Sequence, residues 1–422
     1  MPTSLVMVLG AASGVLHTYF VSRLGGEAIA AVSLVFPLNL VMITLMGGGV
    51  GAGVSSAVAQ ALGAGRRDHA DAVAAHALWI TFATAAVLTL SLVAGAPVLF
   101  EWMGGEGEVL AGATRFARVL FGGAVITFTV STLDSILRGS GNVRIPTTWA
   151  TVSISLQIIF TPIFMFSLGL GLPGAAAATL AGQLVGAIPR ARYFLSSRAP
   201  VSPRMFAARI SPSILAEILR VGIPASLGTL TNYLGLMVLT AIVARYGTAE
   251  IAGFGLGTRL DFLIVMLAFG VGSAVLTLVG LAVGAGSRGR ARAFVDHALW
   301  GVVAVIGAVT AVFVWRPAVW LGLFTADLSI QEIGAVYLRT VGPTYPFIGA
   351  SMVLGFAFQG LGRAMLPMVL VLLRTALVVA AATAVARAGG SVRIVFGIMA
   401  AANVVSTLCL FWSFRRVLAR EY

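Results

Sequence analysis

The segment "ALGAGRRDHADAVAAHALW" at residues 61–79 recurs as "AVGAGSRGRARAFVDHALW" at residues 282–300, and this repetition decides the fold. The two copies lie 221 residues apart and both end in HALW. One shared segment could arise by chance. Its neighbours therefore have to be compared at the same spacing.

The neighbouring segments are repeated at the same spacing. "RGSGNVRIP" at 138–146 aligns with "QGLGRAMLP" at 359–367, again 221 residues away. Near the start the offset becomes 222, where Pro2 aligns with Pro224. We infer that the chain consists of two copies of one unit.

The composition is that of an integral membrane protein. Of the 422 residues, 59% are hydrophobic and 10% are charged, and the mean hydropathy is +1.02. An ordinary soluble domain is far less apolar. All 27 basic residues are Arg, so the chain has no Lys for a nucleotide-binding phosphate loop or for Schiff-base chemistry. These absences argue against an ATP-driven pump and, with no metal-ligand or nucleophile motif, against an enzyme.

Breaks at Gly, Pro and charged residues divide the chain into twelve apolar segments, each long enough to cross a bilayer. We predict an all-α polytopic membrane protein with six spans in each copy. An even number of spans places both copies the same way up, as a parallel repeat. The predicted spans cover roughly 3–22, 28–62, 72–100, 110–138, 144–168, 173–195, 214–244, 250–284, 292–322, 331–361, 364–387 and 392–414.

The repeat predicts two six-helix bundles, residues 1–197 and 214–422, joined by a cytoplasmic linker at 198–213. Arginine concentrates in the loops after even-numbered spans and in the C-terminal tail, so the positive-inside rule places both termini in the cytoplasm. The net charge of +13 reflects that asymmetry and offers no basic soluble face for a nucleic acid. Before Pro224 the second copy has a lead-in, "ILAEILRVGI", that the first copy lacks. We therefore expect the true start to lie upstream of Met1 or the first helix to be shortened.

Five segments resemble signature sequences of the multidrug and toxin extrusion (MATE) transporters, in matching order along nearly the whole chain. They are "FVSRLGG" at 20–26, "ALGAGRRDHA" at 61–70, "LRGSGNVRIP" at 137–146, "LRVGIPASLG" at 219–228 and "FQGLGRAMLP" at 358–367. The resemblance implies a pair of six-helix bundles that exports organic, often cationic or amphipathic, compounds in exchange for protons or sodium. It implies no cofactor.

Asp261, in "GTRLDFLIVMLAFG", is the acid best placed for ion coupling. If its helix enters the membrane near Glu250, Asp261 lies roughly 16 Å along it, near the centre of a ~30 Å core. An ionisable group at that depth costs about 2.5–3.5 kcal/mol and is a functional candidate by default. Many relatives resemble this chain in having an acid two residues after an Arg here. The alternative is a local ion pair with Arg259.

His17 is the second coupling candidate. It stands where some relatives, with a motif resembling "VDTxFVGRLG", have an aspartate, and its counterpart in the second copy is Leu239. Histidine is neutral when deprotonated and ordinarily titrates near pH 6.5, so it suits proton exchange better than a carboxylate-type sodium site. The alternative is a histidine that only contacts a neighbouring helix.

Other polar residues at membrane depth are candidates for the substrate cavity or a polar relay. Each could equally have a structural role and bridge two helices through a hydrogen bond, which contributes around 0.6 kcal/mol to stability in a bilayer. No cluster of residues predicts a metal site. The candidates are Asn39 (which aligns with Asp261 in the repeat), Gln157, Thr161, Gln183, Asn232, Tyr233, Arg259 and Gln359.

The sequence thus predicts a monomeric secondary active exporter in the inner (plasma) membrane of a bacterial-type cell. Its expected partners are small organic substrates, protons or sodium ions, and the lipid bilayer. Two alternatives stay open: a lipid-linked oligosaccharide flippase of the same superfamily, and a transport-inactive membrane scaffold. The residues identify neither the substrate nor the coupling ion.

Overall fold

The computed structural model describes residues 2–196, 199–202 and 210–420, with the side chains of residues 2–8, 11 and 420 left out. The expected start upstream of Met1 and half of the predicted linker, residues 198 and 203–209, lie outside these residues. Every regular element within them is a helix. The chain folds into two compact units, Met1–Gly222 and Ile223–Tyr422.

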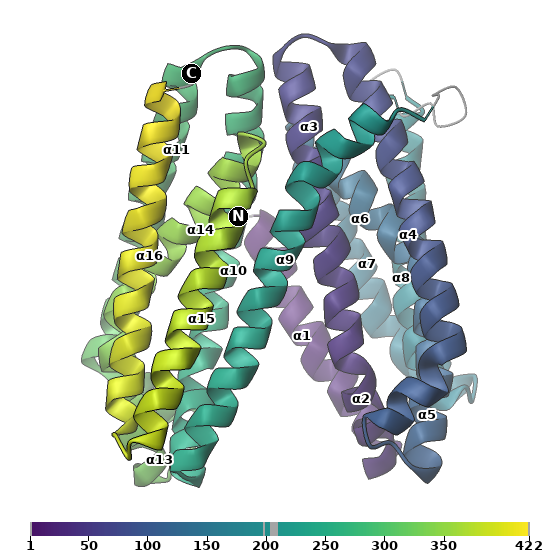
Figure 1. Ribbon diagram of the computed structural model, residues 1–422. Coiled ribbons are helices and arrows are strands. Elements are labelled where there is room, and N and C mark those ends of the chain that lie inside the picture. The colour runs from purple at the N-terminus through teal and green to yellow at the C-terminus, as the bar shows by residue number, and fades with distance from the viewer. Residues whose placement is uncertain (1, 197–198, 203–209, 421–422) are drawn as a thin grey trace. The chain divides into compact units, whose positions relative to one another are not determined.

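In each unit, long helices run side by side along one direction (Figure 1). The first unit consists of α1 (Pro2–Ser22), α2 (Gly26–Ile43), η1 (Thr44–Val50), α3 (Gly51–Gly63), α4 (Arg67–Trp102), α5 (Gly107–Gly122), α6 (Ala124–Gly139), α7 (Arg144–Pro162), η2 (Ile163–Ser167) and α8 (Gly171–Phe194).

The second unit begins inside α9, which runs continuously across the boundary between the units. Its elements are α9 (Pro212–Val243), η3 (Ala244–Tyr246), α10 (Thr248–Gly284), α11 (Arg288–Trp315), α12 (Pro317–Leu321), α13 (Leu328–Val341), η4 (Gly342–Thr344), α14 (Tyr345–Gly360), α15 (Met365–Arg387) and α16 (Val392–Arg420).

These helices correspond one to one with the twelve predicted apolar segments, because consecutive helices such as α2, η1 and α3 form one continuous rod. Among the residues searched, ten helices are long and apolar enough to cross a membrane, and a bent pair makes an eleventh. The helix α1, which is 21 residues long, corresponds to the first predicted span. The predicted fold class is therefore correct.

Two predicted spans need correction. The segment expected at 110–138 is broken into α5 and α6, which meet at 44°. The break falls at consecutive glycines, Gly122 and Gly123, where a Cβ on Gly123 would collide with the side chain of Leu180. The span expected to reach residue 322 ends at Trp315, and the chain after Pro317 forms only the short α12.

Each unit has its own hydrophobic core. Phe100, Phe121 and Phe128 are fully buried in the first unit, and Phe254 and Phe358 are buried in the second. Small residues bring helices close together elsewhere. Almost all of α3, which is rich in Gly, Ala, Ser and Val, is buried. Small side chains along a helix allow such close packing.

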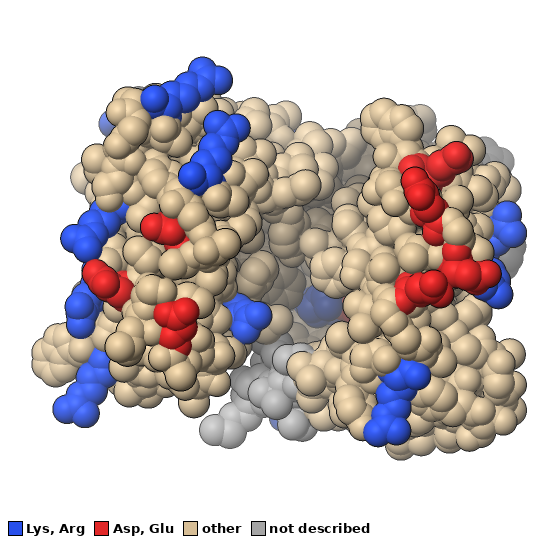
Figure 2. Space-filling view, turned by 90° about the horizontal axis from the view of Figure 1, so that it is seen from below, with Lys and Arg blue, Asp and Glu red and all other residues tan. Residues whose placement is uncertain are grey.

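Many charged side chains lie near the helix ends. The face of the molecule in Figure 2 carries acidic side chains on both units. Exposed acids near these ends include Glu27, Glu101 and Glu108 in the first unit and Asp327 and Glu332 in the second. Asp327 accepts hydrogen bonds from the amide and hydroxyl of Ser329 at the start of α13, which lowers the pKa of its carboxyl.

Candidate functional site

Asp261 lies in the interior of the second unit and is held by a tyrosine. The hydroxyl of Tyr337, from α13, donates a hydrogen bond of 2.6 Å to Oδ2 of Asp261 on α10. Tyr337 is fully buried, and Asp261 is half-buried. Thirteen residues of α10 precede Asp261, which at about 1.5 Å each places it some 20 Å along the helix. The predicted coupling acid is thus a membrane-depth carboxylate with a neutral donor.

Glycines on one face of α10 allow α13 to come close enough for this hydrogen bond. A Cβ at Gly257, one turn before Asp261, would collide with the ring of Tyr337. A Cβ at Gly253, one turn earlier, would press on the backbone of α13 at Gly334. Residues spaced by four share one helix face. The pattern Gly253, Gly257, Asp261 therefore forms a groove that receives Tyr337 and ends at the acid.

Aromatic rings surround the phenol. Tyr337 makes edge contacts with Phe254 and Phe396, with ring centroids 5.5 Å and 5.0 Å away, and those two phenylalanines stack on each other. All three rings are buried. Packing at this density leaves the phenol few alternative rotamers, so its hydroxyl is held in position toward Asp261.

The second carboxylate oxygen of Asp261, Oδ1, is buried and makes no hydrogen bond of standard geometry among the described residues. The hydroxyl of Tyr345 is also buried without such a hydrogen bond, although it lies near enough to Asp261 for a weak one. Tyr345, the first residue of α14, lies close enough to Asp261 to interact with its charge. Buried polar atoms are rarely left without a partner, and such exceptions concentrate at functional sites. A proton or a small cation would satisfy the free oxygen.

Arg259 does not neutralise Asp261. Its exposed side chain places the guanidinium 5.2 Å from the centre of the Phe324 ring, and no salt bridge joins it to Asp261 in the part of the chain that the structure describes. Residues two apart lie on different faces of a helix, which explains the separation. The local ion pair considered as an alternative is therefore not formed.

A second polar cluster in this unit contains a residue that the sequence analysis did not select. Arg374, in the middle of α15, donates hydrogen bonds to Oδ1 of Asn232 at 2.9 Å and to Oδ1 of Asn403 at 3.1 Å. Asn403 in turn donates to the hydroxyl of Thr344. The signal that could have found Arg374 is a lone charge within the apolar run "LVLLRTALVV" at 370–379.

The remaining candidates of the second unit lie apart from these clusters. Tyr233, next to Asn232, is half-buried and makes no hydrogen bond among the described residues. Gln359 is half-buried near the end of α14. Tyr233 follows Asn232 in the sequence, and Gln359 belongs to the signature segment at 358–367. Neither of them forms a hydrogen bond with Asp261 among the described residues.

In the first unit, His17 is half-buried on α1, with its ring edge against Phe116 of α5 at a centroid distance of 6.4 Å. It makes no hydrogen bond within the described residues. The structure therefore places it at a contact between helices, with no carboxylate beside it.

The predicted amides of the first unit do not form one cluster. Gln183 on α8 accepts a hydrogen bond of 2.7 Å from Thr127 on α6, which bridges those helices. The hydroxyl of Thr161 bonds to the backbone oxygen of Gln157, one turn earlier. Asn39 is half-buried on α2 and, in the described part of the chain, has no side-chain hydrogen bond.

The other acid at depth, Asp134, is part of a structural ion pair. Arg190 from α8, 1% exposed, donates to both carboxylate oxygens of Asp134, at 2.6 Å and 3.2 Å. It also donates to the backbone oxygens of Gly186 and Pro146. Arg190 is 56 residues from Asp134 in the chain, and Arg138, one turn after Asp134, also interacts with its charge.

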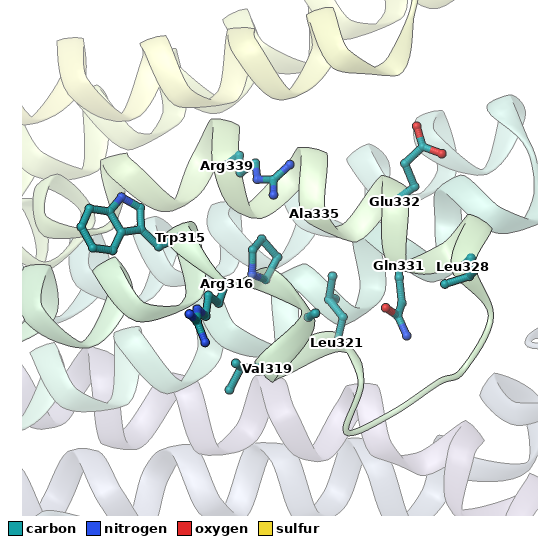
Figure 3. A pocket seen from close by; sticks show the side chains of 11 residues that line it. Trp315, Arg316, Val319, Leu321, Leu328, Gln331, Glu332, Ala335 and Arg339 are labelled. Carbon is teal, nitrogen blue, oxygen red and sulfur yellow. The ribbon is translucent and has the colours of Figure 1, made fainter.

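A cavity of about 720 Å³ opens at one end of the second unit, but none of the predicted site residues lines it. Figure 3 shows that its walls come from the end of α11, from α12 and from α13, with Trp315, Arg316, Glu332 and Arg339 among the lining side chains. The described residues contain no group of His, Cys, Asp and Glu side chains able to hold a metal ion.

Comparison with known proteins identifies the class of protein to which this chain belongs. The family model named MatE matches this chain twice, at residues 2–163 and 224–385, which reproduces the 222-residue offset of the repeat. The chain belongs to the MATE family of membrane transporters. Members of this family are transporters and not enzymes.

Individual relatives span most of the chain. The FAD transporter of Shewanella oneidensis is 28% identical over 370 residues, covering 85% of this chain and 80% of its own length. The multidrug export protein MepA of Staphylococcus aureus strain N315 is 26% identical over 368 residues, covering 86% of this chain and 80% of its own. A solved transporter of the multidrug/oligosaccharidyl-lipid/polysaccharide (MOP) superfamily from Pyrococcus furiosus superposes with a TM-score of 0.91 at 28% identity, covering 99% of this chain and 94% of its own.

Proposed function

We propose that this protein is a secondary active exporter of organic, amphipathic compounds, driven by antiport with protons or sodium, and that Asp261 is the coupling residue. The observation that carries the proposal is the carboxylate at membrane depth with one oxygen held by Tyr337 and the other without a hydrogen bond of standard geometry among the described residues. Such a carboxylate can bind and release a cation without breaking a salt bridge.

Binding of a cation at Asp261 would change the charge inside the second unit. The groups that respond first are Tyr337 and Tyr345, which belong to two segments joined by the short 3₁₀ helix η4. A carboxylate that alternates between charged and neutral states biases the packing of the elements that supply its donors. This is the coupling step that the proposal assigns to the second unit.

His17 has an accessory part in the proposal. His17 makes no hydrogen bond among the described residues, so a change in its protonation breaks none there; its ring contacts Phe116. Asn39, Gln157 and Tyr233 also have side chains free to meet a substrate. Gln183 bonds to Thr127 of a neighbouring helix and Thr161 bonds to the backbone of its own helix, so both serve as a polar wall.

The names of the relatives suggest candidate substrates. MepA is a multidrug export protein, so cationic dyes and drugs are the first compounds to test. The Shewanella relative is an FAD transporter, so flavins are the second class. We further propose that the protein acts as a monomer in the plasma membrane, with both termini in the cytoplasm, as the arginine-rich loops favour.

Reconstituted vesicles provide the test. An imposed pH or sodium gradient should drive efflux of a cationic dye such as ethidium by the wild type, and Asp261→Asn should abolish the dependence on the gradient. Glu332→Gln, which removes an exposed acid of the same unit, is the matched control and should transport normally. Full gradient-driven transport by Asp261→Asn would remove Asp261 from the mechanism. Failure of the wild type to move any dye or flavin, together with a cell-wall precursor defect in a deletion strain, would favour the flippase.

A further inference from the structure

Arg374 carries a full charge in the middle of a membrane-spanning helix. It is the tenth residue of the 23-residue α15, so about 14 Å of helix precedes it. An arginine at such a depth is costly and is kept where it has a partner or a function. Guanidinium groups do not lose their proton in proteins, so neutralisation by deprotonation is not open to it.

The partners that the protein offers to Arg374 are neutral. Both of its hydrogen bonds within the described residues go to amide oxygens, those of Asn232 and Asn403. No salt bridge links it to an acid in the described ranges. By contrast, the buried Arg190 near the end of α8 holds both oxygens of Asp134. The protein therefore neutralises one buried guanidinium and leaves the other positive.

The surroundings of Arg374 fix its orientation. The amide nitrogen of Asn403 donates to the hydroxyl of Thr344, so the amide oxygen is the atom that faces the guanidinium. On the opposite side, a Cβ on Gly235 of α9 would collide with Thr375, and one on Gly228 would touch Met368. These close contacts between α9 and α15 bring Asn232 within reach of Arg374.

Part of the guanidinium stays available to a ligand. Two of its five N–H groups are used by the two amides. The side chain is only half-buried, and Asn232 beside it is exposed. The remaining donors lie in a plane that matches the two oxygens of a carboxylate or a phosphate.

We propose that Arg374, positioned by Asn232 and Asn403, is a binding site for an oxyanion group, a carboxylate or a phosphate, on an amphipathic substrate. The inference rests on the proposed export function and refines its substrate class. A positive group at this depth repels a purely cationic compound and attracts one that carries an anionic group. Asn232 and Asn403 are positioning residues, whereas Arg374 makes the contact.

Two matched ligand pairs test the proposal on the purified full-length protein in nanodiscs. Riboflavin and flavin mononucleotide share their ring and side chain and differ by one phosphate. A tetramethylrhodamine acid and its methyl ester differ by one carboxylate. We expect the wild type to bind the anionic member of one or both pairs more tightly, by roughly ten- to a hundredfold, as charge-assisted hydrogen bonds allow. The pair that responds tells phosphate from carboxylate.

The variants assign the preference to Arg374. Arg374→Gln should bring the two affinities of a pair together, and Arg374→Lys, which keeps the charge without the planar fork, should retain part of the difference. Arg387→Gln, at the exposed end of the same helix, is the control and should behave as the wild type. If Arg374→Gln does not fold, Arg374→Lys and Asn232→Leu provide the comparison.

Several results would overturn the proposal. They are equal affinities within both pairs in the wild type, no binding of any of the four compounds at millimolar concentration, and an unchanged preference in correctly folded Arg374→Gln. Ethidium efflux by the same samples keeps the two ideas separate. Gradient-driven efflux of this cation together with equal affinities within the pairs would leave the export function intact and reject the anion site.

Discussion

The phenol of Tyr337 and the carboxylate of Asp261 lie 76 residues apart in the chain and 2.6 Å apart in the fold. The acid has no charged partner among the described residues, and it is positioned by a neutral donor inside a ring of aromatic side chains. This arrangement separates positioning of the carboxylate from neutralisation of its charge, so each can be tested by its own substitution.

Tyr337→Phe removes the donor and keeps the ring. We expect gradient-driven transport to fall by roughly tenfold or more, since a hydrogen bond to a charged group contributes about 1.5–3 kcal/mol, and some dependence on the gradient should persist because Asp261 remains. Tyr246→Phe is the control, because its hydroxyl is buried without a hydrogen bond in the described residues. Equal initial rates of dye efflux in Tyr337→Phe and the wild type would show that the phenol does not position the acid.

Gly257→Ala should destabilise the second unit. The added methyl group meets the ring of Tyr337, and overpacking of this kind costs about 1–3 kcal/mol. Gly255→Ala, on the same helix, adds a methyl group where no atom lies within 4 Å, and it should preserve or slightly raise stability because Ala is the better helix former. Thermal unfolding midpoints measured in detergent at one scan rate compare the two. A drop in the Gly255 variant equal to that of Gly257 would contradict the close contact.

Arg190→Met should be among the most destabilising single substitutions in the first unit. It leaves Asp134 buried without its partner, and breaking a buried ion pair costs about 3–5 kcal/mol. The exposed pair of Arg115 and Glu108 gives the contrast, because Arg115→Met should cost about 0–1 kcal/mol. Adding Asp134→Leu to Arg190→Met should recover part of the loss. Recovery of folded yield on size-exclusion chromatography measures all three variants.

His17→Ala tests the second coupling candidate. If His17 exchanges protons, transport by the wild type should vary across about pH 5 to 8, the range in which histidine ordinarily titrates, and the variant should show a flatter profile. His297→Ala is the matched control, because His297 lies in the other unit and its one hydrogen bond among the described residues goes to the backbone oxygen of Ala293. Identical pH profiles for His17→Ala and the wild type would leave His17 as a contact between helices.

The sequence was sufficient for the architecture because hydropathy and the repeat are local signals. Twelve apolar segments, the two-fold repetition and the family could all be predicted from it. The break at Gly122 and Gly123 could not, since it depends on how α5 and α6 pack against Leu180.

The site was only partly predictable. Membrane depth singled out Asp261, but its partner Tyr337 comes from another helix, and no spacing rule links residues 76 apart. Arg374 is neither an acid nor a histidine, so it does not stand out in the sequence as a group that could couple transport to protons. Arg190 was missed because it lies near a helix end, where an arginine is ordinarily solvated. In each case the missing information was the tertiary contact.

The short 3₁₀ helix at Gly342–Thr344 has one more consequence. Its last residue, Thr344, accepts the hydrogen bond that orients Asn403 toward Arg374, and the next residue, Tyr345, lies against Asp261. The residues that support Asp261 and Arg374 thus lie next to each other in one short segment of backbone. A rotation of the backbone at this 3₁₀ helix therefore moves Thr344 and Tyr345 together, and with them the surroundings of both Arg374 and Asp261.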